Sequence, residues 1–246
     1  MSKQQHSRQN GYIEQINGPI VQVHLPGARN GEQVRIGEMG IVGEVISLSN
    51  DQATVQSYES TEGVKPGEPV QGLGHPLSVE LGPGLLSSIF DGVQRPLQEI
   101  AQLSGDYIPR GLTINALDRE RSWLFVPEPG LELEQPLKPG AVLGRVQETE
   151  TIEHRILLPP DLEGELIDLA PEGGYTLEQV IGRLRDESGE IHKLYLYHRW
   201  PVRHARPYAQ RDHGIEPLIT GQRILDTFFP LLKGGKGAVP GPFGAG

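Results

Sequence analysis

The amino-terminal part of the chain alternates apolar and polar positions over short runs that are separated by turn residues. The clearest run is 20–25, and similar runs occupy 40–48 and 53–58. A period of two is typical of strands with one buried face. Closely spaced short strands of this kind predict a small closed β-barrel over residues 11–76, after a polar lead at 1–10.

From Gly84 the apolar spacing changes from that of a strand to that of a helix. Apolar residues recur three or four positions apart between Leu86 and Ala101. Gly92 and Pro96 interrupt the run, and a proline inside a helix removes a hydrogen bond, so we expect two short helices. This apolar stripe of the connector at 77–110 is expected to pack in a core rather than to hold a cofactor.

Short strands and many turns return over residues 111–190. Strands are predicted at 122–126, 141–146 and 151–158, before the Pro159-Pro160 break. The sequence Thr176-Leu177-Glu178-Gln179 matches a capping box, which predicts a helix through Leu184. The segment therefore reads as a second β-rich domain.

The last part of the chain, 191–246, contains both the strand-like and the helix-like spacing of apolar residues. An apolar and aromatic strand is predicted at 194–200, and Thr220 can cap a helix that ends at Pro230. A short buried strand is predicted at 236–240. The order of elements indicates the opening of an α/β domain, which makes the whole a multidomain, β-rich chain.

The final six residues fill the first part of a phosphate-binding motif, GxxxxG. They are Gly241, Pro242, Phe243, Gly244, Ala245 and Gly246. In a complete P-loop the glycine-rich backbone wraps the phosphate oxygens, a lysine adds positive charge and a hydroxyl binds Mg²⁺. The lysine and the hydroxyl residue of the motif are not among residues 241–246. The spacing alone is weak in a chain with 32 glycines, and a flexible Gly/Pro segment explains it equally well.

Composition narrows the classes of function. Apolar residues make up 36% and charged residues 22%, as in ordinary soluble proteins, while 32 glycines and 21 prolines imply many tight turns. A net charge of −10 argues against nucleic-acid binding. The absence of cysteine excludes disulfides and thiolate chemistry. No apolar run approaches the ~20 residues that span a bilayer, so we expect a cytoplasmic protein.

One basic and aromatic segment could hold a phosphate or an acidic partner. It contains Arg199, Arg203, Arg206 and Arg211 among His198, Trp200, His204 and Tyr208. Because carboxylates outnumber basic residues in this chain, we favour ion pairs within the protein over a ligand site.

Two other groups of residues contain side chains that are able to bind a metal or to carry protons. His198, His204 and His213 with Asp212 could bind a metal, but no pair has the i, i+4 spacing of a helical metal site, and no metal site is assigned. The pairs Glu132/Glu134 and Glu148/Glu150 could each share one face of a strand, as acid–base catalysis can require. Solvated strand faces are the favoured interpretation.

Four stretches together resemble a known family, the catalytic A subunit (alpha chain) of V-type and archaeal-type rotary ATPases. They are residues 84–97 (GLLSSIFDGVQRPL), 200–203 (WPVR), 217–223 (PLITGQR) and 226–230 (DTFFP), in the family's order. The likeness runs from about Gly11 to Gly246 and is that of an amino-terminal fragment ending inside the P-loop.

The resemblance implies a fold and a function. The fold is an amino-terminal barrel, a bulge domain specific to the A subunit at 111–190, and the start of a P-loop nucleotide-binding domain to which 77–110 also belongs. The implied enzyme binds ATP with Mg²⁺ and hydrolyses or makes it while moving protons or sodium ions. Its implied partners are B subunits in an alternating A/B hexameric ring, together with central and peripheral stalk subunits; it meets the membrane only through the assembled complex.

The resemblance places Gly241 to Gly246 at the nucleotide phosphates and places no catalytic residue within the chain. Phosphoryl transfer needs the P-loop lysine, Mg²⁺, a carboxylate and an arginine from a neighbouring subunit. We therefore expect residues 1–246 alone to bind no nucleotide tightly and to be inactive. Two alternatives stay open: a non-enzymatic assembly module from a truncated gene, and a different P-loop enzyme such as a helicase-like ring.

Overall fold

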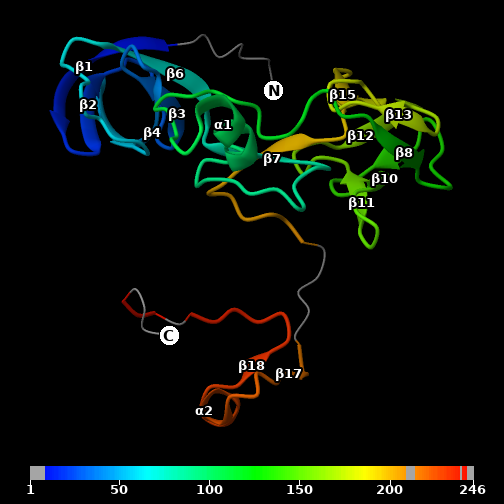
Figure 1. The fold of residues 1–246 in the computed structure, drawn as a ribbon. Coiled ribbons are helices and arrows are strands. Elements are labelled where there is room, and N and C mark those ends of the chain that lie inside the picture. Colours follow the sequence, from blue (N-terminus) through cyan, green and yellow to red (C-terminus); the bar gives the residue numbers. More distant parts are fainter. Residues whose placement is uncertain (1–8, 209–213, 239, 243–246) are drawn as a thin grey trace. The chain divides into compact units, whose positions relative to one another are not determined.

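The computed structural model describes residues 9–208, 214–238 and 240–242, and the chain divides into two compact units, 1–205 and 206–246 (Figure 1). The first unit begins with a closed six-stranded antiparallel barrel. Its strands are β1 (Gln9–Asn17), β2 (Ile20–His24), β3 (Glu32–Ile36), β4 (Ile41–Ser49), β5 (Gln52–Ser57) and β6 (Pro69–Pro76), paired in the order β1-β2-β5-β4-β3-β6. The barrel predicted from the alternation is confirmed.

The barrel closes because every strand sends alternate apolar side chains inward. Val21 and Val23 of β2 are fully buried, as are Val34 and Ile36 of β3. Gly43 of β4 makes room for this packing, since a Cβ there would lie 2.7 Å from the Ile36 Cδ1 atom. Small and branched residues thus fill the interior, as in other small barrels.

The connector after the barrel contains one helix where two were predicted. α1 (Leu97–Ser104) is helical and buries Ile100, but residues before Pro96 form turns, with a single bridge between Phe90 and Pro96. The Asp91 carboxylate accepts backbone N–H groups from the residues that follow it, and such a turn competes with helix. The expected core stripe is also wrong in part, because Leu86 and Ile89 are exposed.

Two four-stranded sheets enclose a second core in the first unit. Their orders are β11-β10-β8-β13 and β15-β14-β12-β9. The strands are β8 (Trp123–Pro127), β9 (Pro136–Leu137), β10 (Val142–Gln147), β11 (Glu153–Leu157), β12 (Gly164–Leu169), β13 (Gly173–Tyr175), β14 (Gly182–Arg185) and β15 (Ile191–Leu194). Phe125, Leu166 and Leu184 belong to one continuous buried cluster. The strands predicted at 122–126, 141–146 and 151–158 are confirmed as β8, β10 and β11.

The helix predicted at 176–184 is wrong. The Gln179 side chain does accept the Thr176 N–H at 2.7 Å, as a capping box requires, yet the chain turns and continues as β14. Leu177 and Ile181 are completely buried, and β14 pairs with β12 on one side and β15 on the other. Non-local pairing and burial therefore outweigh the local helix signal.

The strand predicted at 194–200 is two strands with a bend between them. β15 ends at Leu194, and β16 (His198–Pro201) pairs antiparallel with β7 (Ser78–Leu81) of the connector. The chain thus returns to the connector after completing the second core. This pairing brings Arg199 opposite Glu80, two residues that are far apart in sequence.

The second unit holds a helix, α2 (Arg223–Phe228), between the paired strands β17 (Pro217–Leu218) and β18 (Leu231–Leu232). The helix is confirmed, although Gln222 rather than Thr220 occupies its N-cap. The strand predicted at 236–240 is wrong for its described residues, which are exposed and unpaired with any strand. Neither described helix is long and apolar enough to cross a membrane.

Candidate functional site

The predicted phosphate loop lies mostly outside the described residues. Gly241 and Pro242 are described and exposed, while Phe243, Gly244, Ala245 and Gly246 are not among the residues that the structure describes. The assignment of this loop to nucleotide phosphates stays a prediction. The polar groups that the structure does bring together lie in the first unit, where the barrel meets the connector.

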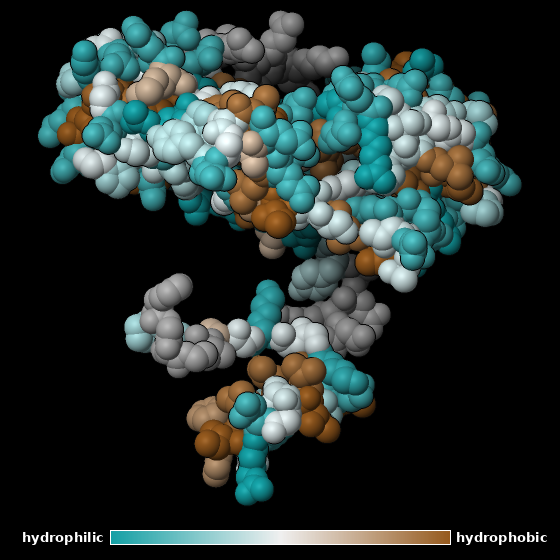
Figure 2. Space-filling model, in the orientation of Figure 1, coloured by the Kyte–Doolittle hydropathy of each residue, from teal (hydrophilic) through white to brown (hydrophobic). Residues whose placement is uncertain are grey.

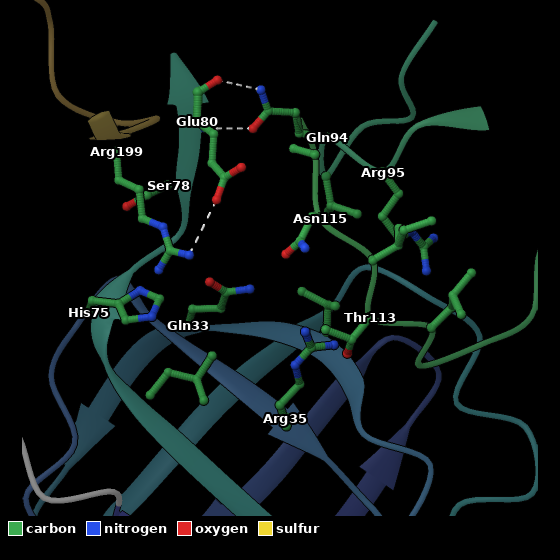
Figure 3. Close-up of a pocket in the computed structure, with 16 residues that line it drawn as sticks. Gln33, Arg35, His75, Ser78, Glu80, Gln94, Arg95, Thr113, Asn115 and Arg199 are labelled. Atoms are coloured by element: carbon green, nitrogen blue, oxygen red, sulfur yellow. Dashed lines mark hydrogen bonds and ion pairs between the residues drawn. The ribbon is translucent and has the colours of Figure 1, made fainter. Parts of the chain in front are cut away.

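A cavity of about 220 Å³ opens between the barrel strands β3, β4 and β6 and the connector (Figure 3). Three arginines, Arg35, Arg95 and Arg199, and one carboxylate, Glu80, line it together with amide and hydroxyl side chains. The lining thus contains more arginines than carboxylates, although the net charge of the chain is −10.

A nearly buried ion triad closes one wall of the cavity. Arg95 donates to Glu59 at 2.5 Å and to Asp91 at 2.7 Å. Glu59 also accepts the N–H groups of Val42 and Gly111, so it joins a barrel strand to the connector. Burial lowers the pKa of Arg95, but the bonds to Asp91 and Glu59 outweigh burial and raise it overall.

Arg35 has no such carboxylate partner among the described residues. Its guanidinium donates to the Gly40 carbonyl at 3.1 Å, within its own hairpin. Burial lowers the pKa of Arg35, the nearby Glu59 charge raises it, and the Arg95 charge lowers it further; the net direction is down. A cation that is partly desolvated beside a second cation favours an added anion.

Glu80 on β7 forms ion pairs with two arginines, Arg119 and Arg199. Its Oε1 atom accepts from Arg119 at 2.5 Å and from Arg199 at 3.3 Å. Its backbone exchanges two hydrogen bonds with the Gln94 amide. The Oε2 atom is buried without a hydrogen-bond partner among the described residues, which is unusual for a carboxylate oxygen.

The basic segment 199–211 does not form one patch in its described part. Arg199 pairs with Glu80, whereas Arg203 forks onto Glu44 of β4 with bonds of 2.6 and 2.7 Å. The Arg203 bonds lower the pKa of Glu44, which also accepts from the Tyr58 hydroxyl. The favoured interpretation, ion pairs within the protein, is confirmed for these two arginines. Arg211, Asp212 and His213 lie outside the described residues.

The paired glutamates do not share strand faces. Glu132 and Glu134 lie in a turn region before β9, and Glu134 adopts φ 65°. Glu150 is exposed, but Glu148 is buried and accepts the N–H groups of Gly84 and Leu86 as well as a bond with His154. The solvated interpretation is therefore wrong for Glu148, which fixes the connector to the second core.

Asp186, Glu190 and His192 bring three possible metal-ligand atoms close together. The Asp186 Oδ1 atom accepts N–H groups from Ser188 and Glu190, and Oδ2 lies 2.8 Å from the His192 ring nitrogen. The carboxylate thereby closes the hairpin between β14 and β15. These bonds hold the side chains of Asp186 and His192 within the hairpin.

The sequence analysis did not single out Glu44, Glu59 and Glu80. These three carboxylates form ion pairs with arginines in the region where the barrel meets the connector, which we call the joint. Two of them carried a signal in the sequence. Glu44 stands within the apolar run of β4, and Glu80 stands between Val79 and Leu81. A charged residue inside an apolar strand is rarely buried unless it is paired.

Two family models match this chain, one for each β core. The ATP synthase alpha/beta family beta-barrel domain matches residues 13–74, and the ATP synthase alpha/beta subunit barrel-sandwich domain matches residues 114–203. These matches coincide with the closed barrel and with the two-sheet core.

Full-length relatives extend the similarity across nearly the whole chain. The V-type ATP synthase alpha chain of Nitrosococcus oceani is 59% identical over 236 residues, which cover 96% of this chain and 40% of the relative. The chain belongs to the ATP synthase alpha/beta family. The A-type ATP synthase subunits A of Thermococcus kodakarensis and Methanopyrus kandleri are 52% and 51% identical over 237 residues, again 96% of this chain and 40% of theirs.

The family resemblance read from the sequence is therefore confirmed, and so is the β-rich fold with its amino-terminal barrel. The chain spans about 40% of the length of these ATP synthase relatives. Within the family-typical stretch 84–97, the structure shows the loop that Glu148 anchors and the Arg95 ion triad. The Glu148 bonds tie this stretch to the second core, and the Arg95–Glu59 pair ties it to the segment that follows β5 of the barrel.

Proposed function

We propose that this chain supplies the amino-terminal part of the catalytic subunit of a rotary ATPase, which binds Mg-ATP and couples its hydrolysis or synthesis to proton or sodium transport. The observation that carries the proposal is the identity of 51–59% to V-type and A-type ATP synthase subunits over 96% of the chain. Identity this high across both β cores supports a shared assembly role as well as a shared fold.

The proposal includes the division of labour and the partners. Residues 11–76 and 111–190 form the barrel and the bulge, while 77–110 and 191–246 belong to the nucleotide-binding domain. The barrel joins a ring with B subunits, the bulge meets peripheral stalk components, and the complex lies on the cytoplasmic side of the membrane.

ATP with Mg²⁺ is the cofactor of the proposed subunit, with residues 241–246 near its phosphates. These six residues include no cation and no hydroxyl, so by themselves they do not fit Mg-ATP. We expect a polypeptide of residues 1–246 to release no phosphate from saturating Mg-ATP. Turnover that survives removal of contaminating enzymes would contradict this expectation.

A chimera tests the proposed function itself. Residues 11–246 replace the matching segment of the Nitrosococcus oceani alpha chain, which is expressed with its own partner subunits. We expect the chimera to assemble and to hydrolyse Mg-ATP at a rate comparable to the unaltered complex. An assembled chimera without hydrolysis would count against the proposal.

The non-enzymatic assembly module remains the second candidate. It is favoured by the second unit, in which none of the described residues is buried. Titration of residues 1–246 with labelled ATP separates the two candidates when it is combined with the chimera. An active chimera supports the catalytic subunit, whereas tight Mg-dependent binding by the 246-residue polypeptide would exclude the module.

A further inference from the structure

The cavity at the joint has the features of a binding site that neither the ion pairs nor the proposed catalysis explains. Figure 3 shows Arg35 and Arg199 entering it from different walls, with the amides of Gln33 and Asn115 facing the same space. Arg35 comes from β3 of the barrel and Arg199 from β16. The site therefore exists only when the barrel and connector are joined.

Two arginines that line the cavity, Arg35 and Arg199, have no carboxylate to themselves among the described residues. Arg35 has no carboxylate partner among the described residues, because the nearby Glu59 is occupied by Arg95 and by two backbone N–H groups. Arg199 shares a single carboxylate oxygen with Arg119. An anion between Arg35 and Arg199 would find charge-assisted donors on both sides.

The size of the cavity restricts the ligand. About 220 Å³ lies below the range of roughly 300–1,000 Å³ that is typical of sites for drug-sized ligands. A tetrahedral oxyanion fits such a volume, whereas a whole nucleotide exceeds it.

Glu80 adds a requirement that distinguishes one oxyanion from another. Its side chain is only 10% exposed, and its buried Oε2 atom lacks a partner among the described residues. A carboxylate only accepts hydrogen bonds, so it repels a fully ionised anion but accepts the O–H of a protonated one. Hydrogen phosphate keeps a proton at neutral pH and sulfate does not. Glu80 lines the same cavity as Arg35 and Arg199.

We propose that the joint between the barrel and the connector binds inorganic phosphate, with Arg35 and Arg199 donating to its negative oxygens and Glu80 accepting a hydrogen bond from its O–H. The inference is independent of ATP hydrolysis, since it concerns a site in the first unit. Bound phosphate connects the barrel to the connector and so stabilises the joint.

The proposal is tested by calorimetric titration of the 246-residue chain at pH 7. One titration uses sodium phosphate, and a second uses sodium sulfate at the same ionic strength. We expect saturable binding at one site for phosphate. Sulfate should bind at least about tenfold more weakly, the effect of one hydrogen bond to a charged group. Binding that does not saturate, or sulfate binding as tight as phosphate, would overturn the proposal.

Variants separate the roles of the residues. Arg35→Gln should weaken phosphate binding at least about tenfold, and Arg35→Lys should restore most of it by returning the charge. Arg185→Gln is the matched control, because Arg185 is exposed and neither it nor its partner Glu165 lines the cavity. Unchanged affinity in Arg35→Gln would refute the site.

The role of Glu80 has its own signature. Glu80→Gln should make sulfate bind as tightly as phosphate, because the amide can donate to either anion. Because this change also removes the negative charge that pairs with Arg119 and Arg199, circular dichroism checks that the variant is folded. Arg199→Gln is the second variant, and it should weaken both anions while leaving their ratio unchanged. A preserved preference for phosphate in folded Glu80→Gln would contradict the assigned role.

A last comparison identifies the source of the phosphate. The cavity volume leads us to expect that ADP binds this site more weakly than inorganic phosphate does. ADP binding of equal affinity that is lost in Arg35→Gln would overturn the assignment to the free anion.

Discussion

The two units of the chain bury their apolar side chains to very different extents. In the first unit, the barrel and the two-sheet core each contain a continuous cluster of buried residues. In the described part of the second unit no residue is buried, and Figure 2 shows apolar side chains on the surface around α2. Ile215, Ile219 and Phe228 are more than two thirds exposed. Secondary structure in the second unit therefore forms without the burial that normally stabilises it.

Hydrogen exchange should show the largest difference between the units. Amides of β3 and β4 should exchange only through global unfolding, which for a domain costs about 5–15 kcal/mol. Amides of α2 should exchange at rates close to those of an unfolded peptide, because a six-residue helix without buried contacts is unstable. Mass spectrometry of peptides from a timed exchange measures both. Equal protection of the two segments would mean that α2 is covered in solution.

The elements that could be predicted from the sequence are those whose conformation is recorded in a local pattern. The alternation of Val21, Val23 and Leu25 was sufficient for the barrel, because each strand shows its buried face locally. The strand containing Leu184 was missed because its conformation depends on pairing with β12 and β15, which no local pattern records. Helix α2 was predicted from local signals alone, and in the structure it buries none of its residues.

The candidate site was less predictable than the fold for a related reason. The terminal loop was visible as a motif, yet the cavity is lined from five separate stretches of the chain, including those of Arg35, Gln94 and Arg199. The pairing of β7 with β16 brings Glu80 opposite Arg199. A single sequence does not show such contacts between distant segments.

Removing one aromatic ring from each unit sharpens the comparison. Phe125 is completely buried in the second core, whereas Phe228 is 72% exposed. We expect Phe125→Ala to lower the free energy of unfolding by about 3–5 kcal/mol through lost transfer energy and a cavity. Phe228→Ala should change it by less than about 0.5 kcal/mol.

Urea denaturation followed by circular dichroism measures both changes in the same chain. A Leu replacement at Phe125 is the control, since it keeps most of the apolar volume and should cost less than the Ala replacement. A large loss of stability in Phe228→Ala would show that α2 packs against another part of the protein.

The smallest change in stability is expected from replacing carboxylates that accept backbone N–H groups, one in each unit. Glu148 is buried and accepts from Gly84 and Leu86, while Asp226 accepts from Thr220 and Gly221 in the second unit. Burial raises the pKa of Glu148, but the bonds from Leu86, Gly84 and His154 lower it overall. For Asp226 the bonds from the Thr220 side chain and backbone lower the pKa.

A carboxylate whose pKa is lowered in the folded state adds stability above its unfolded pKa and loses it as the pH falls through the folded pKa. At pH 7, Glu148→Gln should therefore cost about 1 kcal/mol, since a charged acceptor becomes neutral. The difference in free energy of unfolding between the variant and the parent chain should shrink below pH ~4.3, the ordinary pKa of a glutamate, as Glu148 becomes protonated.

Asp226→Asn should leave the global free energy of unfolding unchanged at every pH, because the unit around it adds little to the cooperative core. Unfolding midpoints between pH 3 and 7 measure both variants. A pH-independent loss in Glu148→Gln would show that Glu148 acts through packing rather than through its charge.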